Sequence, residues 1–200
     1  MSSDMAGTQQ ERDAGTAQRA LDVAEALAQT RGFNGFSYAH VASALGVTKA
    51  SLHYHYPGKA ELGEALIERY AARFAAALER LDAERPGARE RLDGYVELYA
   101  DVLRNRRMCL CGMLAAEYET LPPVMAAAIV RFFDANQEWL SRVLEQGRAD
   151  GTLSFDGPAG EAAQGIIGTL EGAMLIARPY RDTARFDAAV RRLLDGLAPR

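Results

Sequence analysis

The sequence is poor in cysteine and has no long apolar stretch. Its 200 residues contain two cysteines, too few for a disulfide scaffold, which favours a reducing compartment, the cytoplasm. No apolar run approaches the roughly 20 residues that cross a bilayer. The first ten residues have neither a basic start nor an apolar core, so we expect no signal peptide. With 48% hydrophobic residues the chain is too apolar to be disordered, and its length suits one or two compact domains.

Lysine is also scarce, and one stretch lacks carboxylates altogether. Residues 26–60 contain no Asp or Glu, yet they hold both lysines of the chain, Lys49 and Lys59, together with Arg31. All three histidines lie in the same stretch, whereas the whole chain carries a net charge of −4. A positive island therefore interrupts an acidic molecule. Such an island attracts a polyanion, and the acidic remainder limits indiscriminate binding.

Apolar residues recur at helical spacing through nearly the whole chain, and glycine or proline ends each segment. We find no strand alternation, internal repeat or low-complexity tract. The first expected helices cover residues from about 13 to 31, 37 to 45 and 49 to 55. A long helix follows Pro57-Gly58 and ends at Pro86, and the next one ends at about residue 105. Further helices are expected over 109–119, 123–149 and 159–178 and around 186–197. Residues 151–158 read as a loop. The predicted fold class is therefore all-α, with about nine helices.

Two of these helices are short and are separated by a glycine turn. Ser37 and Thr48 are good N-caps for them, and Gly46 supplies the turn. The first expected helix can brace the pair, as in a helix-turn-helix unit that places its second helix in the major groove of DNA. The outward positions of that second helix carry hydroxyl, imidazole, methyl and ammonium groups, which suit phosphate oxygens and base edges. These positions are Lys49, Ala50, Ser51, His53 and His55.

The sequence around this unit, residues 16–66, resembles the tetracycline-repressor (TetR) family of one-component transcriptional regulators. Many positions match the family's pattern at fixed spacing, which makes the signal far more specific than a lone short motif. The matching positions are Gly32-Phe33, Ser37, Val41-Ala42, Gly46-Val47-Thr48, Leu52, His55, Lys59 and Leu62. The chain departs from the family at His53, where a tyrosine is usual, and at Tyr56, where a phenylalanine is usual.

The resemblance implies three regions and a set of DNA contacts. It implies a disordered tail over 1–11, a three-helix helix-turn-helix domain over 12–60, and an effector-binding and dimerisation bundle over 61–200. Lys49 and Ala50 would reach base edges, and Lys59 would contact the DNA backbone. His53 would also contact the DNA, but its reach differs from that of the usual tyrosine. Phosphate contacts would come from Ser37, Tyr38, Thr48, Ser51, Tyr54 and His55.

The resemblance also implies that the later helices enclose an effector pocket and that the last two form a dimer. Aromatic, sulfur and polar residues at helical spacing are candidates for the pocket, although such residues also suit a plain core. The pocket candidates are Tyr95, Tyr99, Cys109, Met113, Glu117, Phe132, Phe133, Asn136 and Trp139. Small and apolar residues near the end of the chain are candidates for the dimer interface, namely Gly165, Gly168, Gly172, Leu175, Phe186, Val190 and Leu194.

Cys109 and Cys111 follow a run of arginines and start an expected helix. Nearby cations and a helix N-terminus both favour the reactive thiolate, so one hypothesis is redox or electrophile sensing. The alternative is that both are small buried core residues. Their spacing disfavours an internal disulfide, and no histidine lies near enough in the sequence to indicate a metal site.

The sequence therefore predicts a homodimeric repressor that binds a palindromic operator in double-stranded DNA and is released by a small-molecule effector. The alternatives are a redox-sensing regulator, a transcriptional activator of the same fold, and a binding module that has lost DNA binding. No hydrolase, P-loop, dinucleotide or zinc-protease motif is present, so we expect no enzymatic activity, no cofactor and no metal. We expect no association with membranes.

Overall fold

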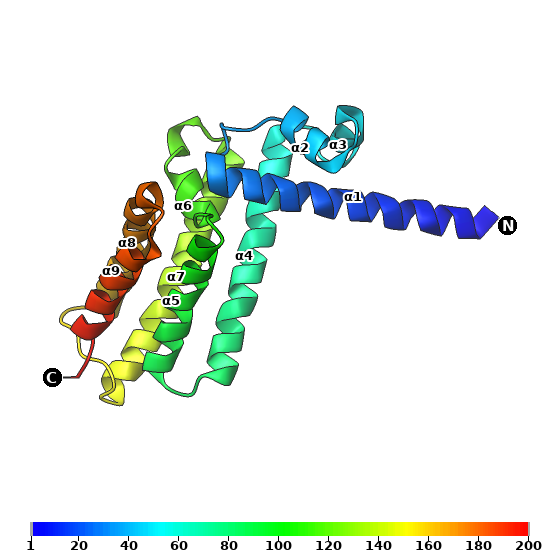
Figure 1. The fold of residues 1–200 in the computed structure, drawn as a ribbon. Coiled ribbons are helices and arrows are strands. Elements are labelled where there is room, and N and C mark those ends of the chain that lie inside the picture. Colours follow the sequence, from blue (N-terminus) through cyan, green and yellow to red (C-terminus); the bar gives the residue numbers. More distant parts are fainter. Residues whose placement is uncertain (1, 200) are drawn as a thin grey trace.

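The computed structural model describes residues 2–199, with side chains from Gly15 onwards. Every regular element in this range is a helix, and α1 (Ser2–Arg31) lies across one end of a bundle of longer helices (Figure 1). The short helices α2 (Tyr38–Leu45) and α3 (Lys49–His55) pack beside α1 at that end. The all-α prediction is confirmed.

The N-terminal unit is held together by the apolar face of α1. Its buried residues Ala20, Ala24 and Ala28 face Val41 of α2 and Leu52 of α3, which are also buried. Because alanine is small, the three helices approach closely. At the end of α2, Gly46 has φ +68°, a left-handed backbone conformation that glycine adopts at little cost.

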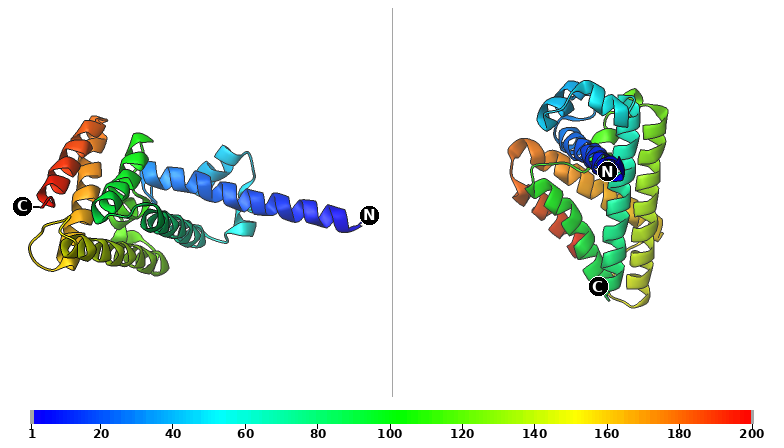
Figure 2. Two further views of the ribbon diagram at one scale, coloured as in Figure 1. Left: turned by 90° about the horizontal axis from the view of Figure 1, so that it is seen from below. Right: turned by 90° about the vertical axis from the view of Figure 1, so that its right-hand side faces the viewer.

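The larger part of the molecule is a bundle of six α-helices and one 3₁₀ helix. The helices α4 (Lys59–Glu84), α5 (Ala88–Arg104) and α7 (Pro123–Ala149) run side by side. The short α6 (Leu110–Ala115) and the 3₁₀ helix η1 (Tyr118–Thr120) connect α5 to α7 at the end nearest α1. The last two helices, α8 (Ala159–Tyr180) and α9 (Thr183–Gly196), pack on each other and on the outer side of this layer (Figure 2).

The element boundaries follow the breakers in the sequence. The pairs Pro57-Gly58 and Pro86-Gly87 separate α3, α4 and α5, and Pro123 is the first residue of α7. The predicted helix over 109–119 is split in the structure, because α6 ends at Ala115 before η1 begins. The expected tail over 1–11 coincides with the first turns of α1, whose side chains lie outside the described residues, so its disorder stays a prediction. No helix within the described residues combines enough length and hydropathy to span a lipid bilayer.

Candidate DNA-binding surface

The local sequence of α3 fixes its start and its orientation. The Thr48 hydroxyl oxygen accepts a hydrogen bond from the backbone N–H of Ser51 at 3.2 Å, which caps the helix. The buried Leu52 anchors one face of α3 to the core. The opposite face is therefore directed outwards and keeps a fixed position relative to α1.

The exposed face of α3 carries most of the predicted DNA-contacting residues. Tyr54 is 76% exposed, a value that is unusual for a tyrosine and leaves its ring and hydroxyl free for a partner. We call the following residues the DNA-facing surface; they are exposed or half-buried and include no carboxylate: Ser37, Thr48, Lys49, Ala50, Ser51, His53, Tyr54 and His55. The structure thus brings together eight of the ten residues that the sequence analysis proposed.

Tyr38 has a different place from the one implied by the resemblance. Its side chain is buried, and its hydroxyl donates towards the carbonyl oxygens of Tyr56 (2.7 Å) and Gly58 (2.6 Å). Burial raises the pKa of Tyr38 to about 12, so the hydroxyl stays protonated and remains a donor. Tyr38 joins α2 to the turn between α3 and α4, and we remove it from the set of proposed phosphate contacts.

Lys59 is likewise engaged within the protein. Its ammonium group donates hydrogen bonds to the carbonyl oxygens of Phe33 (2.5 Å) and Phe36 (2.6 Å). It also lies 4.3 and 4.5 Å from the centres of those two aromatic rings. Burial lowers the pKa of Lys59. Lys59 therefore ties the start of α4 to the turn between α1 and α2, a role that the sequence analysis missed, and the implied contact with the DNA backbone stays a prediction.

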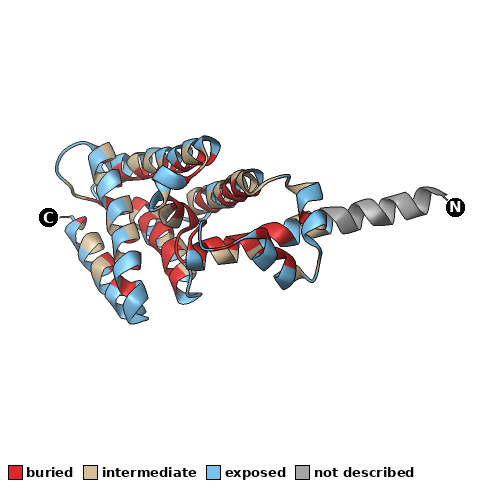
Figure 3. Ribbon diagram, turned by 90° about the horizontal axis from the view of Figure 1, so that it is seen from above, coloured by how far each residue is buried: buried red, intermediate tan, exposed pale blue. Residues whose placement is uncertain are grey.

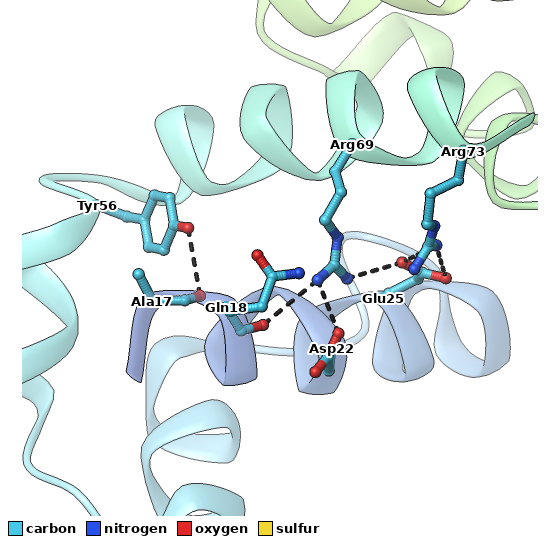
Figure 4. Close-up of polar contacts among 7 residues, drawn as sticks. All are labelled: Ala17, Gln18, Asp22, Glu25, Tyr56, Arg69 and Arg73. Atoms are coloured by element: carbon cyan, nitrogen blue, oxygen red, sulfur yellow. Dashed lines mark hydrogen bonds and ion pairs between the residues drawn. The ribbon is translucent and has the colours of Figure 1, made fainter. Parts of the chain in front are cut away.

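The brace helix α1 is clamped to α4 by an ion-pair network (Figure 4). Glu25 is 7% exposed and accepts hydrogen bonds from Arg69 at 2.9 Å and from Arg73 at 2.5 Å. Arg69 also pairs with Asp22 at 2.7 Å. Because Glu25 is buried, the two arginines supply the counter-charge and the hydrogen bonds that a carboxylate removed from water needs. The network fixes the angle between the DNA-reading helices and the bundle.

A second junction joins the turn after α1 to the segment before η1. The Glu117 carboxylate accepts hydrogen bonds from the backbone N–H groups of Phe33 (2.8 Å) and Asn34 (3.1 Å). Gly32, with φ +82°, leaves room for it, because a Cβ at this position would lie 2.3 Å from Glu117 Oε1. The prediction that Glu117 lines an effector pocket is therefore corrected. Glu117 is a link between the two parts of the molecule.

The other pocket candidates in α5 and α7 do gather in the bundle. Tyr95 and Tyr99 lie with their hydroxyl oxygens 3.2 Å apart, and Tyr95 donates to Asn136 Oδ1 at 3.1 Å. The Tyr95 ring stacks on Trp139 at 5.6 Å. We call the following residues the aromatic cluster: Phe74, Tyr95, Tyr99, Phe132, Phe133 and Trp139.

A cleft of about 290 Å³ lies between α4 and α7 beside this cluster. Phe74 and Phe132 belong to its wall, and Glu68 and Arg131 add one charge of each sign, so the cleft offers aromatic faces and charged groups to a small molecule. Met113, another candidate, lies away from this wall, and its sulfur is 3.3 Å from the Arg178 guanidinium.

The sequence analysis missed Glu171, the one carboxylate in the apolar middle of α8. Its Oε1 is buried without a hydrogen-bond partner among the described residues. Burial raises the pKa of Glu171 to about 7, while a hydrogen bond with Cys109 opposes this shift. Gly112 makes room for the carboxyl group, since a Cβ there would lie 2.1 Å from Glu171 Oε2. A single carboxylate within the run Gly165–Ala177 was the signal available in the sequence.

Cys109 and Cys111 are buried core residues, as the second of the two interpretations of the sequence has it, and the structure does not support the hypothesis of reactive thiolates. Cys109 is 2% exposed and Cys111 is 0% exposed. The Tyr70 hydroxyl donates to Cys109 Sγ at 3.7 Å. Burial, followed by the nearby Glu171, raises the pKa of both thiols well above the ordinary value. The neighbouring residues Arg104–Arg107 are exposed and do not offset this effect.

We therefore expect both thiols to react slowly in the folded protein. At pH 7.5, reaction with 5,5′-dithiobis(2-nitrobenzoate) should be at least about 100-fold slower in buffer than in denaturing urea, because burial and the low thiolate fraction both retard it. The absorbance of released nitrothiobenzoate measures the rate. The variants Cys109→Ser and Cys111→Ser assign each phase. A native protein that reacts as fast as the unfolded chain would restore the redox hypothesis.

The fold and the site define a class of protein. A braced helix-turn-helix unit with an exposed recognition helix free of carboxylates is suited to the major groove of DNA. Among the described residues no group of three or more histidine, cysteine or acidic side chains is placed to hold a metal ion. The molecule is a helix-turn-helix DNA-binding protein with a large helical second domain.

Comparison with known proteins identifies the family. Residues 20–66 match the bacterial regulatory proteins of the tetR family, and residues 88–193 match the tetracyclin repressor-like C-terminal domain. The chain belongs to the tetracycline-repressor family and is a DNA-binding transcriptional regulator.

Individual relatives agree with this assignment. The transcriptional regulator AcuR of Cereibacter sphaeroides is 30% identical over 154 residues, which cover 74% of this chain and 69% of AcuR. A TetR-family regulator from Agrobacterium tumefaciens has a solved structure with a TM-score of 0.90 and 31% identity, covering 93% of this chain and 99% of that one. The reduced form of NemR from Escherichia coli gives a TM-score of 0.79 at 28% identity, covering 92% and 98% of the two chains.

Proposed function

We propose that the protein is a homodimeric repressor that binds a roughly palindromic operator and is released by a small molecule. The observation that carries this proposal is the DNA-facing surface, in which Tyr54 and Lys49 stand exposed on a recognition helix with no carboxylate beside them. Carboxylates would be repelled by phosphates, so their absence suits DNA. The similarity to NemR, whose name describes a transcriptional repressor, supports repression over activation.

Binding to a palindromic operator requires a two-fold symmetric dimer, and the outer face of α8 is suited to contact a second copy of the chain. The last two helices, next to the C-terminus, carry many exposed residues (Figure 3). On α8 these include Leu175 and Ile176, which are 57% and 60% exposed although both are large and apolar. A Cβ at Gly165, Gly168 or Gly172 would have no neighbour within 4 Å, so a second copy of α8 can approach closely there. We propose that these residues form the dimer face, with the half-buried Leu194 of α9 at its edge.

Two of the predicted dimer residues face the other way. Phe186 is 1% exposed and Val190 is 7% exposed, because both pack into the core of their own subunit. They hold α9 in place behind the proposed dimer face and are left out of it. In the proposed dimer the two recognition helices enter successive major grooves about 34–36 Å apart.

The cleft beside the aromatic cluster supports the response to an effector. Its walls come from α4 and α7, and α4 is also the helix clamped to α1 by Glu25. An effector that separates α4 from α7 would therefore change the spacing of the two recognition helices. By linkage, the effector must weaken DNA binding by the same factor by which DNA weakens effector binding.

Selection of the operator from random DNA duplexes tests the proposal, and Lys49 gives its first prediction. We expect Lys49→Ala to lower affinity by about 1–3 kcal/mol for operators with the preferred base at the contacted position and to relax preference there, because lysine donates to guanine acceptors. Competition binding against single-position operator variants measures this change.

The matched control is Ser51→Ala, on the same helix, for which we expect a smaller and similar weakening on every sequence, as for a phosphate contact. An equal loss on all sequences for Lys49→Ala would contradict the base-reading role. Failure of the wild-type protein to enrich any sequence would refute the operator proposal. Footprinting relative to the promoter distinguishes repression from activation.

A further inference from the structure

A groove of about 620 Å³ lies at the end of the bundle nearest α1, and nothing in the proposed function uses it. It is formed where α5 and α8 end and α9 begins. We call it the arginine groove, after the charged residues that line it: Arg104, Arg106, Arg107, Arg178, Arg181 and Asp182. It is separate from the cleft beside the aromatic cluster, which lies between α4 and α7.

The charge of the groove is unbalanced. Among its five arginines, Arg104 pairs with Glu97 and Asp101 on its own helix. No ion pair within the described residues involves Arg106, Arg107 or Arg181. The single lining carboxylate, Asp182, caps α9 by accepting a hydrogen bond from Ala184 N at 3.0 Å. Guanidinium groups that converge on a concave surface without counter-charges attract an anion, which they bind through paired hydrogen bonds.

The backbone at two of these arginines is a second, independent observation. Arg106 has φ +57° and Arg181 has φ +52°, and they are the only non-glycine residues with positive φ in the described chain. Each follows the end of a helix, where glycine is the usual residue because it adopts this conformation without a steric penalty. Arginine there carries a steric penalty that glycine avoids. Both exceptions line the same groove, so the two strained positions coincide with guanidinium groups that have no counter-charge within the described residues.

The groove is also connected to the DNA-reading unit. The Arg178 guanidinium donates a hydrogen bond to the carbonyl oxygen of Thr30, in the last turn of α1. The backbone N–H of Met108, just after Arg107, donates to the carbonyl oxygen of Gln29 at 3.2 Å. An anion that draws Arg178 into the groove therefore competes with its bond to α1.

We propose that the arginine groove binds a small organic polyanion bearing phosphate or carboxylate groups and that this binding alters the position of α1. The proposed anion binding is argued from the groove alone, whereas the proposed effect of the anion on DNA affinity rests on the proposed function. The other conceivable occupant is the phosphate backbone of the operator, which needs cations spread along an extended surface, whereas these arginines line one local groove at the junction of three helices.

Calorimetric titration of the full-length protein at low ionic strength tests the proposal. The probes are sodium pyrophosphate and sodium citrate, which distinguish a phosphate site from a carboxylate site. We expect saturable binding of one probe with one site per chain. In the variants Arg106→Gly and Arg181→Gly the affinity should fall at least tenfold. Because glycine relieves the positive φ, both variants should fold as stably as the wild type or more so.

The control is Arg80→Ala, which removes an exposed arginine of α4 outside the groove and should leave the affinity unchanged. Absence of binding to the wild type, or equal binding by all variants, would overturn the proposal. A third outcome would also overturn the proposal: neither probe binds, and the glycine variants bind the operator more weakly and with a shallower salt dependence. In that case the occupant of the groove would be DNA. Operator binding by the unliganded wild type is measured separately, so failure of the groove leaves the proposed function standing.

Discussion

Replacement of Leu175 by glutamate is expected to convert the dimer into monomers and to lower operator affinity by about 100-fold or more. Leu175 is 57% exposed in the subunit, so the substitution removes little packing within the fold. In the proposed dimer the new carboxylate would be buried against Ile176 and against a second copy of itself, which carries the same charge. A monomer also loses the gain in affinity from binding two half-sites together.

Sedimentation velocity measures the oligomeric state, and gel-shift titration measures the affinity. The matched control is Val130→Glu, which places the same charge at an exposed apolar residue of α7, 46% exposed in the subunit and outside the proposed dimer face. The control should remain dimeric and bind DNA as the wild type does. A wild-type protein that sediments as a monomer, or a Leu175→Glu variant that stays dimeric, would contradict the assignment of this face.

Replacement of Glu171 by glutamine is expected to stabilise the protein at pH 8 by up to about 3 kcal/mol and to change little at pH 5. Burial raises the pKa of Glu171 to about 7, from the model-compound value of 4.5. The folded protein therefore holds this proton more tightly than the unfolded chain does. The contribution of Glu171 to the free energy of unfolding is constant below about pH 4.5, falls as the pH rises to about 7 and stays low above it. Glutamine has nearly the same shape and carries no charge at either pH.

Urea unfolding at pH 5 and pH 8, at one fixed protein concentration, measures the two free energies. Glu138→Gln, at an exposed position of α7, is the control, for which we expect no pH-dependent difference. If Glu171→Gln destabilised the protein equally at both pH values, the carboxyl group would stabilise the fold through its hydrogen bonds, and the burial of its charge would not be the dominant effect.

The fold could be predicted from the sequence because its signals are local. Helical periodicity and the breakers at Gly46, Pro57-Gly58 and Pro86-Gly87 lie within a few residues of the elements that they delimit. The exposed face of α3 was predictable for the same reason, since Leu52 fixes its buried side and Thr48 fixes its start.

The errors and omissions concern side chains whose partners are distant in the sequence. Lys59 binds the carbonyl groups of Phe33 and Phe36, 26 and 23 positions away, and Glu117 binds the amide of Phe33 across 84 positions. No local pattern reveals such a partner. The sequence left two interpretations open for the cysteines, because the arginines before them are adjacent in sequence whereas burial, which dominates the pKa of a thiol, is a property of the whole bundle.

The bond between Glu117 and the turn after α1 has a consequence for signal transmission. One carboxylate holds two successive amides, and the absence of a side chain at Gly32 lets it come this close. In the proposed repressor, a displacement of the connection between α6 and α7 would therefore act directly on the turn between α1 and α2. A displacement of about 1 Å at this one junction would be enough to change the placement of the DNA-binding helices relative to a distant effector site.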